Sequence, residues 1–214
     1  MTNSVTFVSL AIATIAIPPA ANRDIAGSTH LVGAGLLIAT RDGDQWRFSS
    51  EAATIAAGEK EQNLLLWLAD RLPIADTLIG WHIDPYQVPA LINAAADADP
   101  AIAHHFMVRL ARALRNNVVD LSIDSGGAAA PAFSEVAQDA AIAAPSMEPE
   151  VLMGAWSTGR LDAVRHDLAT EAVGTWLLFL RQAQAAGMDA EDATRAWMHR
   201  RHRVRSVKNA PGAA

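Results

Sequence analysis

The sequence predicts an α/β protein with a mixed sheet of about five strands flanked by helices. Two observations support this fold class. The N-terminal part holds three strand-like runs, two of them joined by a turn signal, and helical and strand-like segments alternate after them. The chain has 214 residues, of which 51% are hydrophobic and 19% charged. It is therefore long and apolar enough to bury a full core.

Five segments are predicted as strands because they are short, apolar and rich in β-branched residues. The first is apolar along its whole length, as expected of a central strand, and Pro18 and Pro19 end it. Asp42, Gly43 and Asp44 are a turn signal that predicts a hairpin between the second and third strands. The predicted strands are Thr6–Ile17, Leu31–Thr40, Gln45–Ser49, Thr77–His82 and Val118–Leu121.

Helices are predicted where apolar residues recur at steps of three and four. Pro73 ends the first helix, and Pro85 suits the first turn of the second. In the helix beginning at Arg160, the second half, Val173–Leu180, is apolar nearly all round, which predicts a buried helix. The predicted helices are Glu59–Leu72, Ile83 or Asp84 to Ala96, Ile102–Arg115, Ala132–Ala143, Glu148–Ser157, Arg160–Arg181 and Asp189–Arg205.

Charge is spread unevenly along the chain. The formal net charge is −6, yet six of the 17 basic residues lie near the C-terminus. We therefore expect an acidic domain over residues 1–188, followed by a basic helix and tail over residues 189–214. The six basic residues are Arg195, Arg200, Arg201, Arg203, Arg205 and Lys208.

Targeting and redox signals indicate a cytoplasmic protein. The apolar run Val5–Ile17 is shorter than the roughly 20 residues of a membrane span, and no basic residue precedes it as in a signal peptide. We interpret it as a buried strand and expect no membrane association. The absence of cysteine excludes disulfides, thiolate metal sites and a cysteine nucleophile, and it fits a reducing compartment.

A polar cluster interrupts the helix that begins at Arg160. His166 and Thr170 are four residues apart, and so are Asp167 and Glu171, so that all four can face one point. Such a cluster at the edge of a core is typical of a metal or acid–base site. The alternative is the solvated face of an amphipathic helix.

The residues around this cluster resemble a known motif. The helix is preceded by Gly159, begins with Arg160 and Leu161, and ends in a run from Thr175 to Arg181 that reads TWLLFLR. This pattern resembles the third motif of the DEDD 3′–5′ exonucleases, in particular the stand-alone relatives of the proofreading domain of family B DNA polymerases. Glu171 stands at the motif's Asp. Asp167 stands at the position of its Tyr, and His166 has the spacing of the His-type relatives.

Two further stretches extend the resemblance to about residues 5–185. The strand FVSLAIATI, residues 7–15, is similar to the first motif, but Ala11 and Ala13 stand where the family has Asp and Glu. The stretch GWHIDPYQVPAL, residues 80–91, is similar to the second motif, with Gln87 in place of Asp. The resemblance implies the ribonuclease H-like fold.

The resemblance also implies how the family works. Its members hold two Mg²⁺ ions about 4 Å apart, which requires several converging carboxylates. Three of the four expected carboxylates are replaced here, by Ala11, Ala13 and Gln87. We therefore expect a pseudoenzyme without two-metal nuclease activity and without a cofactor. The alternative is an active Mg²⁺- or Mn²⁺-dependent 3′–5′ exonuclease whose ligands have moved to a cluster of Asp84, Asp120, Asp167 and Glu171.

The function expected from these observations is a 3′–5′ exonuclease-like protein that acts as a nucleic-acid-binding or scaffolding module. Arg200, Arg201, Arg203 and Arg205 are the candidate contacts to single-stranded nucleic acid, and a protein partner is the other candidate.

Three smaller patterns are given structural interpretations. Gly33 and Gly35 lie inside a strand, where small residues permit close packing. The six tryptophans lie mostly in apolar runs and are interpreted as core. For Trp81 and Tyr86, which flank the second motif, we also prefer a core position over stacking on a base.

Overall fold

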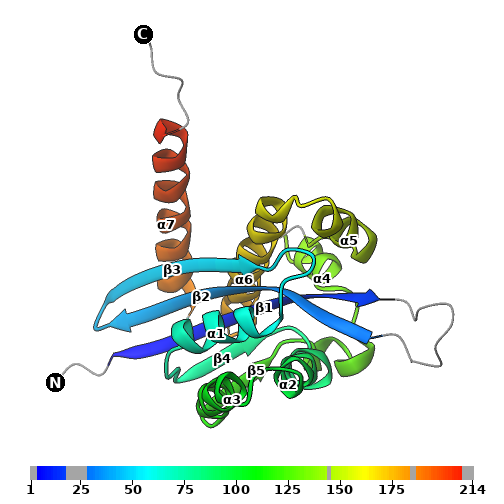
Figure 1. Ribbon diagram of the computed structural model, residues 1–214. Helices are drawn as coiled ribbons and strands as arrows, with labels where there is room; N and C mark the ends of the chain where they lie inside the picture. Colours follow the sequence, from blue (N-terminus) through cyan, green and yellow to red (C-terminus); the bar gives the residue numbers. More distant parts are fainter. Residues whose placement is uncertain (1–3, 18–27, 144–145, 184–186, 209–214) are drawn as a thin grey trace, which may run out of the picture.

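The computed structural model describes residues 4–17, 28–143, 146–183 and 187–208. For Ile17, Ser28, Gly187, Met188 and residues 201–208 it describes the backbone but not the side chains. Its five-stranded mixed sheet has the order β3-β2-β1-β4-β5 (Figure 1). β1 pairs antiparallel with β2 and parallel with β4, and β3 and β5 form the edges. The α/β prediction is confirmed, and the arrangement is consistent with a ribonuclease H-like fold. The strands are β1 Val5–Ile17, β2 Ser28–Asp42, β3 Gln45–Thr54, β4 Thr77–Gly80 and β5 Asn117–Asp120.

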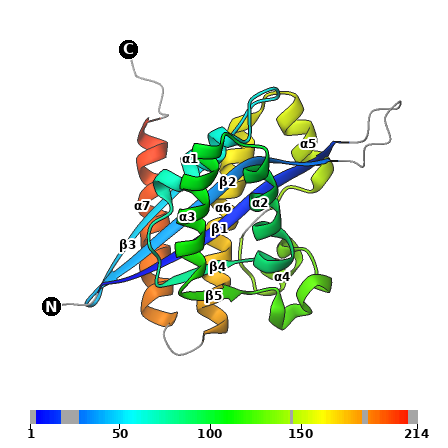
Figure 2. The ribbon, with the colours of Figure 1, turned by 60° about the horizontal axis from the view of Figure 1, so that its bottom comes forward.

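Helices cover both faces of the sheet. α1, α2 and α3 pack together on one face, and α6 runs across the other face over β1, β2 and β3 (Figures 1 and 2). α4 and α5 lie beside α6, and α7 contacts β3 and α6. The helices are α1 Gln62–Arg71, α2 Val88–Ala96, α3 Pro100–Leu114, α4 Phe133–Asp139, α5 Pro149–Ser157, α6 Leu161–Gln182 and α7 Gly187–Lys208. In the described part of the chain, no helix is long and apolar enough to cross a membrane.

Alternate residues of β1 belong to two separate cores. Leu10 and Ile12 pack with α1, α2 and α3, whereas Ala11 and Ala13 pack on the α6 side. This alternation is the two-residue period of a strand buried on both faces. Both alanines are therefore buried in the core on the α6 side.

Small residues on β2 let α6 approach closely. A Cβ at Gly35 would lie 2.5 Å from the backbone oxygen of Leu168 in α6, and one at Gly33 would lie 2.6 Å from the Leu168 side chain. Both distances are shorter than real Cβ contacts. The close-packing interpretation of the two glycines is confirmed.

The predicted elements differ from the structure most clearly at β3 and after β4. Smaller differences lie at other element ends, such as that of α4, which ends at Asp139 rather than Ala143. β3 extends to Thr54, because β2 continues beside it and pairs with it as far as Gly33. The segment after β4 begins as a single turn of π-helix, Ile83–Gln87, and only then becomes α2. The left-handed backbone of His82 (φ 56°) ends β4 before this turn. Neither the extension of β3 nor the π-helical turn can be predicted from the propensities of the local sequence.

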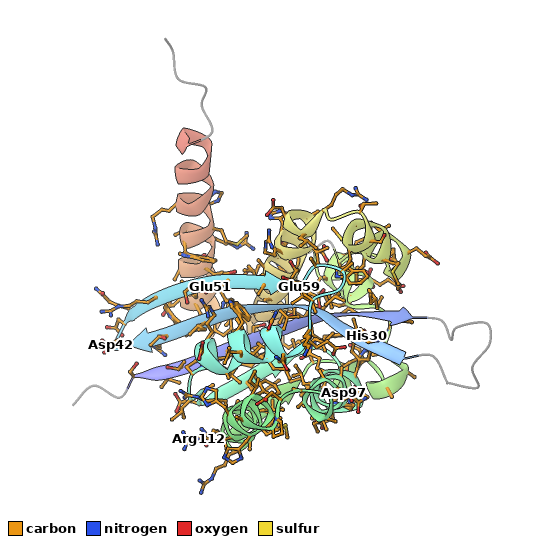
Figure 3. The ribbon with its side chains drawn as sticks, viewed as in Figure 1. His30, Asp42, Glu51, Glu59, Asp97 and Arg112 are labelled. Carbon is orange, nitrogen blue, oxygen red and sulfur yellow. The ribbon has the colours of Figure 1, made fainter. Side chains whose placement is uncertain are left out.

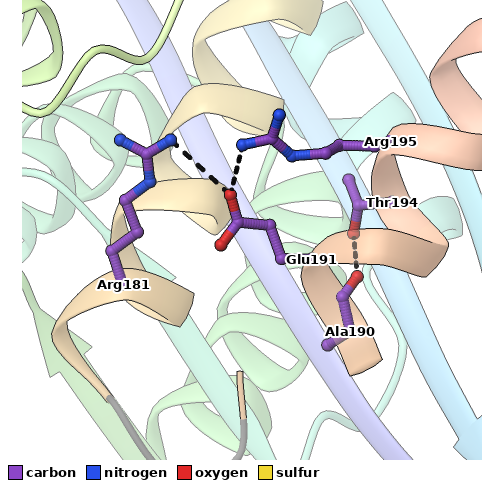
Figure 4. A network of polar contacts seen from close by, with 5 residues as sticks. All are labelled: Arg181, Ala190, Glu191, Thr194 and Arg195. Atoms are coloured by element: carbon purple, nitrogen blue, oxygen red, sulfur yellow. Dashed lines mark hydrogen bonds and ion pairs between the residues drawn. The ribbon is translucent and has the colours of Figure 1, made fainter. Parts of the chain in front are cut away.

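A polar network fastens α7 to α6 (Figure 4). Glu191 lies 3.5 Å from Arg181 of α6 and 2.6 Å from Arg195. Beneath it, the buried Thr194 hydroxyl donates to the Ala190 carbonyl at 2.7 Å and accepts from the Trp176 indole at 2.9 Å. The first half of α7 is thus anchored to the body, and the helix then projects from it (Figure 1).

Candidate functional site

A cavity of about 260 Å³ opens between the end of β1, the π-helical turn, α6 and the segments that flank α4. Residues from five separate stretches of the chain line it. They are Ile12, Ala13 and Thr14; Trp81, His82, Tyr86 and Gln87; Ala130, Pro131, Ala132 and Phe133; Ser146, Met147, Pro149 and Leu152; and Asp167, Leu168 and Glu171.

Two carboxylates of α6 project into this cavity. Asp167 and Glu171 lie one helical turn apart on the same side of the helix, as their spacing predicted. The Ser146 hydroxyl donates to Oε2 of Glu171 at 3.1 Å, and the Met147 amide donates to Oδ2 of Asp167 at 3.0 Å. The segment before α5 therefore contacts both acids.

Burial perturbs both carboxyl groups. It raises the pKa of Glu171 to about 7; the Ser146 hydrogen bond opposes this rise, and the charge of Asp167 adds to it. Burial also raises the pKa of Asp167, against the lowering effects of the Met147 amide and of His166. At neutral pH the pair thus carries less than its full negative charge.

Gln87 is integrated into the core rather than presented as a ligand. Its side chain is 3% exposed, and Nε2 donates to the Leu10 carbonyl at 3.2 Å, a bond that an ionised carboxylate could not donate. Its Oε1 is buried and has no hydrogen-bond partner among the residues that the structure describes. Ala13 lines the cavity, whereas Ala11 is fully buried and does not.

Aromatic side chains form another part of the wall. Trp81 is 6% exposed and packs against Phe133, with ring centroids 5.7 Å apart, so its core interpretation is confirmed. Tyr86 is 43% exposed, so its core interpretation is wrong; its hydroxyl bonds that of Thr14 at the cavity wall. Tyr86 lies in the π-helical turn, where the sequence predicted a regular helix.

Asp120 and Asp84 do not line the cavity. Asp120 accepts from the His82 amide at 3.0 Å and the Ser122 hydroxyl at 2.7 Å, and it also accepts from the Asp84 amide at 3.3 Å. These hydrogen bonds hold the backbone that follows β4 against Asp120. The side chain of Asp84 is exposed. Among the described residues, no group of three or more His, Asp or Glu could hold a metal ion.

His166 and Thr170 are not part of the cavity wall. His166 is exposed, and the Thr170 hydroxyl donates to the His166 carbonyl at 2.8 Å within the helix. Only Asp167 and Glu171 of the predicted cluster line the cavity. Ser146 and Met147 were missed, because a non-periodic segment carries no sequence signal for contact with α6.

The basic residues of the C-terminus lie on α7. Arg200 is exposed, and the helix continues through Arg201, Arg203 and Arg205 to Lys208. The side chains of these last four lie outside the described residues. Figure 1 shows this part of α7 projecting from the body, away from α3.

Comparison with protein-family models, with curated proteins and with solved structures found no match.

Proposed function

We propose that this chain is a 3′–5′ exonuclease-like protein that has lost its two-metal centre and acts as a non-catalytic binding or scaffolding module. One observation carries the proposal. Ala13, Gln87 and Glu171 belong to the three stretches that resemble exonuclease motifs, and all three line the same cavity. The convergence of stretches so far apart in sequence supports their derivation from a common site.

The residues at this cavity do not fit two divalent cations. Ala11 and Ala13 offer no ligand atom, and the Gln87 amide nitrogen is bonded to the Leu10 carbonyl. The remaining acids, Asp167 and Glu171, both have raised pKa values. Since Asp120 is committed to backbone amides, the relocated cluster has only two members in the cavity. These contacts favour a binding module over a nuclease.

The first test is degradation of end-labelled single-stranded DNA and RNA in the presence of Mg²⁺ or Mn²⁺. We expect no cleavage above background, and no difference between the chain and its Glu171→Ala variant. Metal-dependent 3′–5′ cleavage that disappears in Glu171→Ala would overturn the proposal and would favour relocated ligands.

The basic end of α7 is the proposed contact for single-stranded nucleic acid. Binding through phosphates releases counterions, so affinity should fall steeply with salt. Replacing Arg200, Arg201, Arg203 and Arg205 by Ala removes four charges and should lower the slope of log affinity against log salt by up to about 3.

A matched variant separates this contact from a general charge effect. Arg112 of α3 lies on the opposite side of the molecule from α7 (Figure 3). The control removes four exposed arginines from other elements and should retain most of the affinity. Equal losses in both variants, or no binding at low salt, would contradict the nucleic-acid contact and leave protein scaffolding as the function. The control residues are Arg47, Arg112, Arg115 and Arg160.

A further inference from the structure

The charge of the cavity restricts what it can bind. Among the described residues, its wall carries the carboxyl groups of Asp167 and Glu171 but no Lys or Arg. The ring of His82 is already engaged, with Nε2 3.1 Å from the Gly127 carbonyl. A phosphate or carboxylate group would therefore meet negative charge without a cationic partner. The cavity is suited to a ligand of positive charge.

The size and the rest of the wall indicate a small, partly apolar ligand. Trp81, Phe133 and Leu152 supply aromatic and aliphatic surface. The cavity volume, about 260 Å³, lies just below the range of roughly 300–1,000 Å³ that is typical of ligand pockets. A tryptophan ring also attracts a cation placed over its face.

Two wall residues also have unpaired polar atoms. Gln87 Oε1 and Trp81 Nε1 are buried with no hydrogen-bond partner in the described part of the chain, and the two residues are 3% and 6% exposed. Unpaired buried polar atoms are rare, because each one costs free energy. Gln87 Oε1 is an acceptor, but it has almost no accessible surface and lies beside Gly80, so the case for a cationic ligand rests on Asp167 and Glu171.

We propose that this cavity binds a small organic ammonium ion, with its charged nitrogen against Asp167 and Glu171 and its apolar part against the aromatic wall. The inference rests on the proposed loss of the metal centre, because two divalent ions would occupy the same acids. The ammonium group belongs either to a free amine or to the side chain of a lysine, which share this chemistry.

Binding should be linked to proton release. A cation stabilises the ionised form of Glu171, and at pH 7 about half of its carboxyl groups are protonated, because the pKa is about 7. The other titratable groups at this place are Asp167, His166, His82 and Tyr86. Release should therefore approach about half a proton per ligand from Glu171.

The experiment is isothermal titration calorimetry of the whole chain at pH 7 with EDTA, in buffers of different ionisation enthalpy. Phenethylammonium is the probe, and 2-phenylethanol is its neutral counterpart. We expect the ammonium ion to bind at least about tenfold more tightly than the alcohol, with the predicted proton release.

The matched variants are Glu171→Gln and Glu135→Gln. Glu171→Gln keeps the shape of the side chain, and it should weaken ammonium binding by about tenfold or more and abolish proton release. Glu135 is exposed on α4 outside the cavity wall, so its variant should bind like the unchanged chain. A thermal melt of each variant establishes that it is folded.

The outcomes separate this inference from the proposed function. Equal affinity for the alcohol, no ammonium binding, or an unchanged affinity in folded Glu171→Gln would overturn the inference alone. Metal-dependent cleavage of nucleic acid would overturn the proposed function. Tighter binding of Nα-acetyl-lysine methylamide than of phenethylammonium would identify the ligand as a lysine side chain, and weaker binding would identify it as a free amine.

Discussion

The side chain of Glu171 lies in surroundings that disfavour its ionised form. Burial, and to a smaller extent the charge of Asp167 one turn away, raise its pKa to about 7, while the Ser146 hydroxyl opposes the shift. Carboxylates at Ala11 and Ala13 would add repulsion on the same side of β1. Their absence therefore removes a source of instability from a cavity that still retains two acids.

This carboxyl group makes stability depend on pH. Because its folded-state pKa exceeds the ordinary value of 4.5, the folded chain binds more protons than the unfolded chain between about pH 4.5 and 7. Stability attributable to Glu171 is thus unimpaired below pH 4.5, falls as the pH rises and is lowest above pH 7. The full shift corresponds to about 3 kcal/mol.

Glu171→Gln should remove this penalty. We expect its free energy of unfolding to exceed that of the unchanged chain by about 2–3 kcal/mol at pH 8 and to match it near pH 4.5. Urea denaturation at both pH values measures the difference, and Glu135→Gln on exposed α4 serves as the control. An equal effect at both pH values would show that burial of the charge is not the cause.

At the scale of elements, the contact between β2 and α6 depends on glycines, which have no side chain to separate the strand from the helix. Gly35 lies against the backbone of Leu168, which cannot rotate away as a side chain could. The sheet and the helix would have to separate to admit a single methyl group. The position of α6, and with it Asp167 and Glu171, is therefore set by this contact.

Gly35→Ala should destabilise the fold by about 1–3 kcal/mol or more through overpacking. Gly154→Ala is the matched substitution, because a Cβ at Gly154 of α5 meets nothing within 4 Å and Ala favours a helix by up to about 1 kcal/mol. Chemical denaturation of both variants measures the difference. Similar stabilities for the two variants would contradict the close approach.

Elements with strong local patterns were the ones that could be predicted. The hairpin at Gly43, the buried strand β1 and the apolar half of α6 all follow from periodicity and turn chemistry. The extension of β3 to Thr54 and the π-helical turn at Ile83–Gln87 depend on the neighbouring β2 and on the ties around Asp120. The strand pairing and the hydrogen bonds of Asp120 join segments that are distant in sequence, so the local sequence does not predict them.

The same distinction holds for the site. The spacing of Asp167 and Glu171 predicted that they lie together on one helix. Ala13 and Gln87, which the sequence singled out by their positions in two other stretches, line the same cavity. The hydrogen bonds from the Ser146 and Met147 segment could not be predicted, because they depend on how it packs against α6.

At the scale of the whole molecule, α7 is joined to the body by a buried hydrogen bond and by the partly exposed ion pairs of Glu191. Ala190, Trp197 and Met198 also pack against the core on the α6 side. Thr194→Val retains the shape of the side chain but leaves the Trp176 indole N–H without its acceptor. We expect a loss of about 1–3 kcal/mol in the free energy of unfolding. Thr170→Val is the control, because its hydroxyl bonds only the His166 carbonyl within α6, and it should stay within about 0.5 kcal/mol.

The two faces of the sheet are completed at different times during synthesis. α1, α2 and α3 all precede β5, so the core beneath them holds every partner once the ribosome has released the chain through Asp120. The other face waits for α6, which ends at Gln182. A nascent chain of intermediate length therefore exposes one apolar side of a nearly finished sheet, the state in which chaperones engage incomplete domains. The waiting face presents small residues such as Gly33 and Gly35 where α6 will pack, but it also carries the aromatic side chains of Phe7, Trp46 and Phe48. It therefore remains an apolar surface until α6 has been synthesised.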